Sequence, residues 1–236
     1  MKIVSLLVAL FYMGVAYTAD NEVYIDQSGA TVNIDVEQLG SGNIIGGSDA
    51  TAGSMTALDL DITSATLDIN QIGNLNKFLG DITSDTYTGF FEFDGDSNVF
   101  NIQTDPTNTF GADNSNIYVD VTGNTNTFTL NQATSALASQ LDLDWIINGG
   151  GNTITASIDA DGATNYMSLD GNDNTVTFDG DGYAGQYFKL EQTGGSRTFN
   201  ISQQSTLDND WLRIISNGSN GTVCVNQNDQ GTSTSC

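Results

Sequence analysis

Apolar and polar residues alternate along most of this chain, and the alternation is interrupted at regularly placed glycines. Around Gly149, for example, the residues two, four and six places before it and three, five and seven places after it form one set: Leu143, Trp145, Ile147, Asn152, Ile154 and Ala156. Most of the residues between them are polar, such as Asp144 and Thr153. A period of two predicts β-strands that bury one face, so we expect two short strands around each glycine.

Six of these glycines are followed three residues later by asparagine: Gly40/Asn43, Gly73/Asn76, Gly95/Asn98, Gly123/Asn126, Gly149/Asn152 and Gly171/Asn174. Two later turns, at Gly194 and Gly218, carry Arg197 and Gly221 at the asparagine position. Glycine suits a corner that needs a positive φ. The chain reverses over five residues between the flanking inward positions, so we expect the asparagines to point inward and to stack as a ladder.

From Gly73 onward the turn glycines are 22, 28, 26, 22, 23 and 24 residues apart. A strand–turn–strand unit repeated at such a period is typical of solenoids, whose stacked repeats bury a core that no single repeat can bury. The pattern therefore predicts an all-β fold, a β-solenoid of about eight rungs of roughly 22–28 residues, in one domain over residues 20–236. The longer interval from Gly40 to Gly73 is interpreted as three half-rungs, each the length of the interval from Gly29 to Gly40. Insertions are expected on the other edge, at residues 46–57, 80–88, 104–116 and 132–140.

Two turns carry a longer motif, Gln-x-Gly-x-x-Asn, beginning at Gln38 and Gln71, and Gln192 with Gly194 keeps its first half. This motif resembles the core of curlin repeats, the unit of the secreted curli fibre subunits, loosely over about residues 21–229. Further glutamines resemble that family's second ladder glutamine: Gln103, Gln132, Gln203 and Gln227. The resemblance implies a β-solenoid that polymerises into extracellular amyloid fibres. The chain departs from the motif where the leading glutamine is replaced, at Phe93, Val121, Ile147 and Leu169.

The charge of the chain is strongly one-sided. Its 236 residues include 29 acidic and only five basic side chains, for a net charge of −24, with no histidine. Nucleic acids and anionic membranes are bound through basic patches, so neither is an expected partner. The acidic residues fall at repeated outward or turn positions with no unique pair, and histidine, the commonest general base, is missing. We therefore expect a protein that is not an enzyme.

Residues 1–19 have the order of a secretory signal peptide: Lys2, an apolar run from Ile3 to Val15, and then small residues. Cleavage after Ala16 and cleavage after Ala19 both remain open. No later segment is long and apolar enough for a membrane span. Export favours a disulfide between Cys224 and Cys236, with two free thiols as the alternative if the protein is never oxidised.

Several Asp-rich turns are candidates for weak Ca²⁺ binding, because they offer oxygen ligands at every second residue: Asp159, Asp161, Asp179 and Asp181. Ordinary turn chemistry explains the same residues, and no other cofactor is expected. Trp145 is expected in the core, whereas Trp211 falls outside the inward register and is the better candidate for carbohydrate contact. The expected function is a secreted structural or adhesive protein at the cell surface that assembles through the ends of its rod. The alternative is a fibre or adhesin module that binds a glycan or receptor through its insertion loops.

Overall fold

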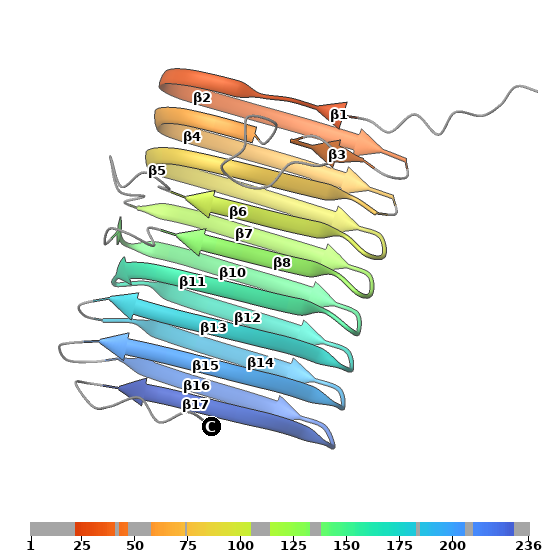
Figure 1. Cartoon of the computed structure of the whole chain (residues 1–236). Coiled ribbons are helices and arrows are strands. Elements are labelled where there is room, and N and C mark those ends of the chain that lie inside the picture. The colour runs from red at the N-terminus through yellow and green to blue at the C-terminus, as the bar shows by residue number, and fades with distance from the viewer. Residues whose placement is uncertain are drawn as a thin grey trace, which may run out of the picture.

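The computed structural model describes residues 22–40, 43–46, 58–73, 75–104, 114–132, 138–182, 185–205 and 210–228, and these form one rod of stacked strands (Figure 1). No helix occurs in these ranges, so none there is long and apolar enough to cross a membrane. The strands are β1 (Glu22–Val23), β2 (Asp26–Leu39), β3 (Ile44–Ile45), β4 (Leu58–Ile72), β5 (Lys77–Asp94), β6 (Val99–Thr104), β7 (Ser115–Thr122), β8 (Thr127–Gln132), β9 (Ala138–Ser139), β10 (Leu141–Asn148), β11 (Thr153–Asp161), β12 (Thr164–Asp170), β13 (Asn174–Gly182), β14 (Tyr187–Thr193), β15 (Arg197–Ser205), β16 (Trp211–Asn217) and β17 (Gly221–Asn228).

The rod has two faces, each a parallel ladder. The pre-turn face holds the strands that lead into each turn glycine, paired in the order β2, β4, β5, β7, β10, β12, β14 and β16. The post-turn face holds the strands that follow the turns: β1, β3, the start of β5, β6, β8, β11, β13, β15 and β17. The predicted all-β solenoid is therefore confirmed, and eight strands stack in the pre-turn ladder.

The register reproduces the glycine spacing. Ile117 pairs with Leu143 and Leu143 with Asn165, so each step between rungs equals the interval between the corresponding turn glycines. The interpretation of the interval from Gly40 to Gly73 was wrong, however: Gln38 pairs directly with Gln71, so the two glycines are one rung apart and not one and a half. The extra length of this rung falls between β3 and β4, outside the described residues for its greater part.

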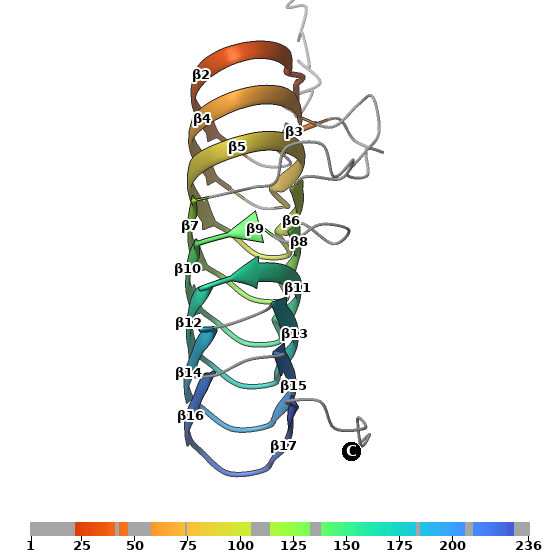
Figure 2. The same ribbon diagram turned by 90° about the vertical axis from the view of Figure 1, so that its left-hand side faces the viewer.

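The two edges of the rod differ. Tight turns form the glycine edge, on the right in Figure 1, and the opposite edge is called the loop edge. In the first rungs no loop is needed there, because β2, β4 and β5 themselves curve around the edge (Figure 2). The expected insertion at residues 80–88 is thus wrong: it lies within β5, and its Ile82 and Tyr87 are buried in the core.

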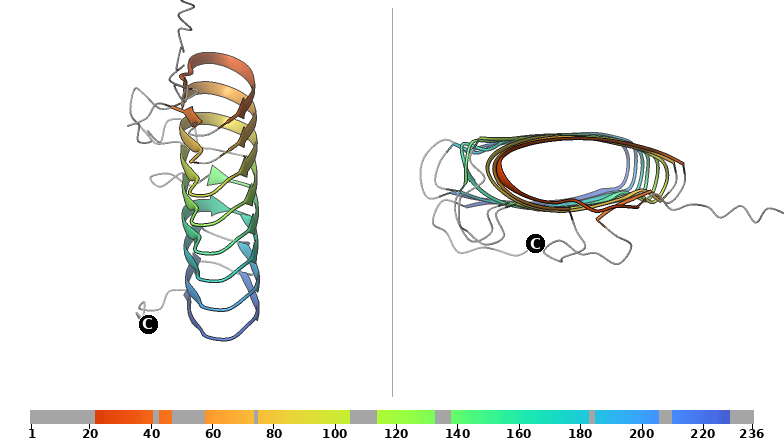
Figure 3. Two further views of the ribbon diagram at one scale, coloured as in Figure 1. Left: turned by 90° about the vertical axis from the view of Figure 1, so that its right-hand side faces the viewer. Right: turned by 90° about the horizontal axis from the view of Figure 1, so that it is seen from above.

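One continuous core fills the flattened oval that is seen along the rod axis (Figure 3). The core contains a cluster of six aromatic side chains in edge-on, tilted or stacked contacts: Phe78, Phe91, Phe93, Phe100, Phe128 and Trp145. Trp145 is fully buried, as expected. Three inward glycines leave room for rings: a Cβ at Gly89 would overlap the ring of Phe91, and one at Gly80 or Gly180 would lie 3.1 Å from Phe78 or 2.9 Å from Phe178.

Candidate functional site: the turn ladders and the rod ends

The turn asparagines form an inward ladder along the glycine edge. All six are buried, and Asn152, for example, is inaccessible to solvent. Four of the six side-chain oxygens accept a hydrogen bond from the backbone N–H of the asparagine one rung earlier, over 2.7–3.0 Å: Asn98 from Asn76, Asn126 from Asn98, Asn152 from Asn126, and Asn174 from Asn152. The asparagines thus point inward, and the ladder that they form joins side chain to backbone. In Asn43, Asn76, Asn98 and Asn152 the Nδ2 group instead closes its own turn, as in the 2.8 Å bond from Asn152 to the Gly149 carbonyl.

Glycine at the turn is required by stacking as well as by its φ. Gly149 has a φ of 142°, and a Cβ there would overlap the carbonyl oxygen of Gly123 one rung earlier. Gly123, Gly171, Gly194 and Gly218 are blocked in the same way by the preceding glycine. The turns therefore stack closely enough for the backbone hydrogen bonds to continue through them, for example from Gly149 N–H to the Asp170 carbonyl over 2.7 Å.

A second ladder, which the sequence pattern did not predict, runs along the outside of the same edge. The residue after some of the turn glycines offers a side-chain oxygen to the next rung: Asp96 accepts from Asn124 N–H, and Asn124 accepts from Gly150 N–H, both over 2.8 Å. The two ladders run in opposite directions and together satisfy turn N–H groups that would otherwise lack a partner. The signal was present as a recurring Asp or Asn at this position, but such residues are common in any turn.

The candidate glutamines divide by register. Gln38, Gln71 and Gln192 are buried, and Gln71 Nε2 donates to Gln38 Oε1 over 2.6 Å. Gln192 instead donates to the carbonyl of Gly171 over 3.2 Å, because buried Leu169 occupies the stacked position in the rung before it. Of the four glutamines that resemble the second ladder glutamine, Gln132 and Gln203 point inward, whereas Gln103 pairs with Asp81 in an outward column. Among these four, only Gln203 and Gln227 are register partners of each other.

The inner ladder stops at Arg197. Its side chain cannot accept the hydrogen bond that an asparagine would, and it lies half-buried over Gly221, where a Cβ would be 2.5 Å from its Cγ. Asn174 Nδ2 and Arg197 Nε are both buried without a hydrogen-bond partner in the described part of the chain. An open polar groove of about 370 Å³ follows this break, between the last three turns.

The ends of the rod expose core positions. Val223 and Val225 stack on the buried Phe199 and Ile201, yet they are 46% and 42% exposed because no described strand pairs with the far side of β17. The half-buried apolar residues that pack on the core all belong to the first or last rung: Val23, Ile25, Val32, Val36, Leu212 and Ile214. Both ends therefore resemble cut surfaces of a longer stack.

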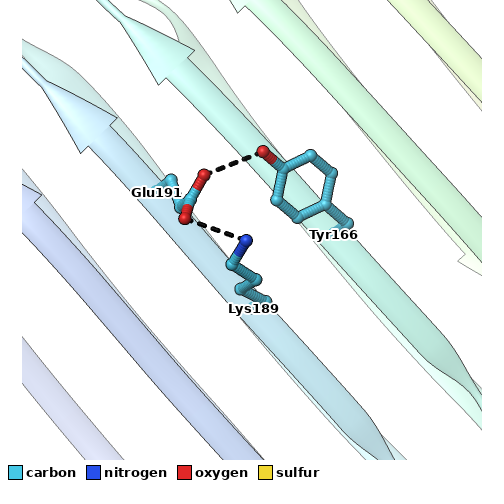
Figure 4. A network of polar contacts seen from close by, with 3 residues as sticks. All are labelled: Tyr166, Lys189 and Glu191. Atoms are coloured by element: carbon cyan, nitrogen blue, oxygen red, sulfur yellow. Dashed lines mark hydrogen bonds and ion pairs between the residues drawn. The ribbon is translucent and has the colours of Figure 1, made fainter.

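Outward side chains near the C-terminal end form a cation–aromatic group on the pre-turn face. Lys189 lies 2.8 Å from Glu191 Oε1 and 4.7 Å from the ring centroid of Tyr166, whose hydroxyl donates to Glu191 Oε2 over 2.9 Å (Figure 4). The hydrogen bond from Lys189 lowers the pKa of Glu191 and correspondingly raises that of Lys189. One rung further, Trp211 is 40% exposed and stacks on Tyr187 with ring centroids 4.2 Å apart.

Near the N-terminal end, carboxylates stack on the post-turn side of the rod. Asp26, Asp59 and Asp81 occupy one column in three successive rungs. Asp81 is 9% exposed, and its Oδ1 is buried with no hydrogen-bond partner among the described residues. Burial, followed by repulsion from Asp59, raises the pKa of Asp81 to about 6, and burial, Asp26 and Asp61 raise the pKa of Asp59.

The remaining candidates are placed only in part. Asp159 and Asp181 are register partners in neighbouring rungs, Asp179 pairs with Ser157, and Asp161 pairs with Ser139. Among the described residues no group of three or more Asp, Glu, His or Cys is arranged to hold a metal ion. Residues 1–19 and Cys236 lie outside the described residues, so the signal peptide and the Cys224–Cys236 disulfide stay predictions.

No protein-family model matches this chain, and neither does any curated protein or solved structure.

Proposed function

We propose that this protein is a secreted structural subunit that builds an extracellular fibre or surface matrix by pairing its rod ends with other copies of itself. In this proposal its role is mechanical and not catalytic. The same role belongs to the curlin-repeat subunits, whose repeat core the Gln-x-Gly-x-x-Asn motifs of this chain resemble.

The observation that carries the proposal is the exposure of core positions at both ends. Val223 and Val225 end two columns that are buried through the interior of the rod, and Val23 and Ile25 begin them. An open strand edge with apolar side chains beside it is a template for pairing with another chain. Solenoids that stay monomeric need polar capping repeats at this position, and neither terminal rung has a polar inward face.

Charge sets the condition for assembly. A chain with net charge −24 repels its own copies, and this repulsion is screened over about 8 Å at physiological ionic strength. Assembly is therefore promoted by salt or by Ca²⁺ bound weakly along the acidic turns, including Asp159, Asp161, Asp179 and Asp181.

The test uses protein recovered from the medium of an export-competent host, followed by electron microscopy and an amyloid dye. We expect unbranched fibres that form faster at 150 mM salt than at low salt. Fibres that form equally fast with chelator at low salt would refute the electrostatic part, and a monodisperse rod under all conditions would refute the proposal. Mass spectrometry of the same sample identifies the cleavage site, after Ala16 or after Ala19, and the disulfide between Cys224 and Cys236.

The second candidate, a glycan-binding or receptor-binding module, is favoured by one observation. Trp211 keeps 40% of its surface exposed although Tyr187 covers one face of its ring. Under this alternative a monodisperse rod binds carbohydrate, and Trp211→Ala removes the binding without changing the stability of the rod.

A further inference from the structure

This inference rests on the proposed function and concerns the geometry of the joint between copies. The two ends of the rod are chemically different. Residues 22–46, the first rung, contain four acidic side chains and no basic one: Glu22, Asp26, Asp35 and Glu37. Residues 210–228, the last rung, contain one of each, Asp210 and Arg213. Contact between two N-terminal ends would place four negative charges against four, whereas contact between unlike ends would not.

The strand register determines which residues would meet if unlike ends came together. Each inward column runs through the whole rod from a residue of the first rung to a residue of the last. On the post-turn face, one column runs from Val23 to Val223 and another from Ile25 and Leu58 to Val225. A further rung placed below β17 with the same register would therefore lay Val23 of the next copy on Val223.

The pre-turn face gives the same result. Its columns connect Ile34 with Leu212 and Val36 with Ile214, all four of them on the core side. Apolar residues would thus meet apolar residues in these four core columns of the joint. Removing them from water is the main favourable term.

The polar columns match as well. On the post-turn face, Gln27 and Gln227 are the ends of one column, and Gln203 precedes Gln227 in it, so the joint would extend a glutamine pair to a third member. Within the rod the amides of this pair donate to the carbonyls of Gln186 and Asp210, so the column matches glutamine with glutamine in register and not through a bond between their amides.

The outward column that contains the group in Figure 4 ends in opposite charges. It runs through Asp35, Asp68, Phe90, Tyr118, Asp144, Tyr166, Lys189 and Arg213. Arg213 is exposed at the last rung and Asp35 at the first. At a joint in continued register these two side chains would be neighbours at the strand spacing of about 4.8 Å.

We propose that the C-terminal end of one copy docks on the N-terminal end of the next with parallel strands in continued register, and that Arg213 pairs with Asp35 of the next copy. The joint is heterologous, so it does not close and gives an open, polar filament. The ion pair selects unlike ends, while the apolar columns supply the attraction.

The test is charge reversal at the joint with a matched control inside the rod. R213E and D35R are each expected to slow fibre elongation about tenfold, the usual scale for one interfacial charge pair. The double variant D35R/R213E restores the pair with reversed sign and is expected within about threefold of the wild type. D68R lies in the same column one rung inside the rod and serves as the control for folding and net charge.

A covalent test does not depend on elongation rates. D35C/R213C should give a ladder of disulfide-linked oligomers on oxidation, because adjacent rungs bring Cα atoms within disulfide range. D35C alone should give no linked dimer at that position. Linked dimers of D35C, or elongation of R213E and D35R that is no slower than that of D68R, would overturn the proposed joint. If the wild type still forms fibres, these results leave the proposed function intact. A wild type that forms no fibres overturns the proposed function itself.

Discussion

The interior turns and the first turn use the same residue under different constraints. At Gly149 a side chain is excluded twice, by a φ of 142° and by the carbonyl of Gly123 one rung earlier. At Gly40 the φ is 131°, but the nearest atom to a Cβ would be Asn43 Oδ1 at 3.9 Å. A repeated residue is thus fixed by stacking only where another rung precedes it. The ends of the rod keep the repeat without the contacts that make it necessary.

The largest expected effect is the loss of stability when the turn glycine is replaced by alanine, and it should differ between an interior turn and the first turn. Gly149→Ala should destabilise the rod by roughly 4 kcal/mol or more, because backbone strain and a clash with a neighbouring backbone add. Gly40→Ala should cost only the strain, about 1–3 kcal/mol. Thermal unfolding followed by circular dichroism measures both. Equal losses of stability for the two variants would show that stacking does not constrain the interior glycines.

The asparagine position gives the next largest effect. Asn152→Ala removes the acceptor of Asn126 N–H and the donor to Gly149, which leaves buried backbone groups unpaired and should cost about 2–3 kcal/mol. Arg197→Ala, at the same turn position beyond the ladder, should change stability by less than about 1 kcal/mol. Denaturant titration of both proteins is the measurement. The contrast fails if the arginine variant loses as much stability as the asparagine variant.

A smaller effect concerns the stacked carboxylates near the N-terminal end. The pKa of Asp81 is about 6 in the rod against 3.8 in an unfolded chain, so the folded state holds the proton more tightly between these values. The resulting stabilisation is fully present below pH 4 and is lost as the pH rises through 6. Asp81→Asn should therefore stabilise the protein by about 2 kcal/mol at pH 7.5 and leave it unchanged at pH 4.

The control for this prediction is Asp68→Asn, which removes an exposed carboxyl from the neighbouring strand. Melting temperatures of the three proteins at pH 4, 6 and 7.5 separate a local effect at Asp81 from the general effect of lowering the net charge. A gain in stability that is the same at pH 4 and pH 7.5 would contradict the assignment.

The strand–turn–strand arrangement of the solenoid could be predicted from the sequence, because the apolar alternation and the glycine spacing recur in every rung. The inward asparagines were deduced from five residues across a reversal, and all six are buried. The path at the loop edge was not deduced, because residues 80–88 begin at Gly80 and are followed by Gly89, and such glycines in an alternating pattern indicate a break. In the structure these glycines leave room for Phe78 and Phe91, so the strand continues.

The second ladder and the division of the glutamines depended on register. Asp96 and Asn124 are ordinary turn residues in the sequence and become acceptors only when the turns stack. Gln103 differs from Gln132 by one step of the alternation, which places it on the outward face. A half-buried position like that of Leu212 cannot be identified from its own sequence, since its exposure depends on the absence of a neighbouring rung.

The mass per unit length of the fibres, from dark-field electron microscopy, tests the central claim most directly. Eight rungs about 4.8 Å apart give a rod about 40 Å long. End-to-end stacking of folded rods therefore predicts one chain, 25.0 kDa in full, for about every 40 Å of a single filament. One chain for about every 4.8 Å would mean that chains stack sideways as flat layers, and would contradict assembly through the ends of the folded solenoid.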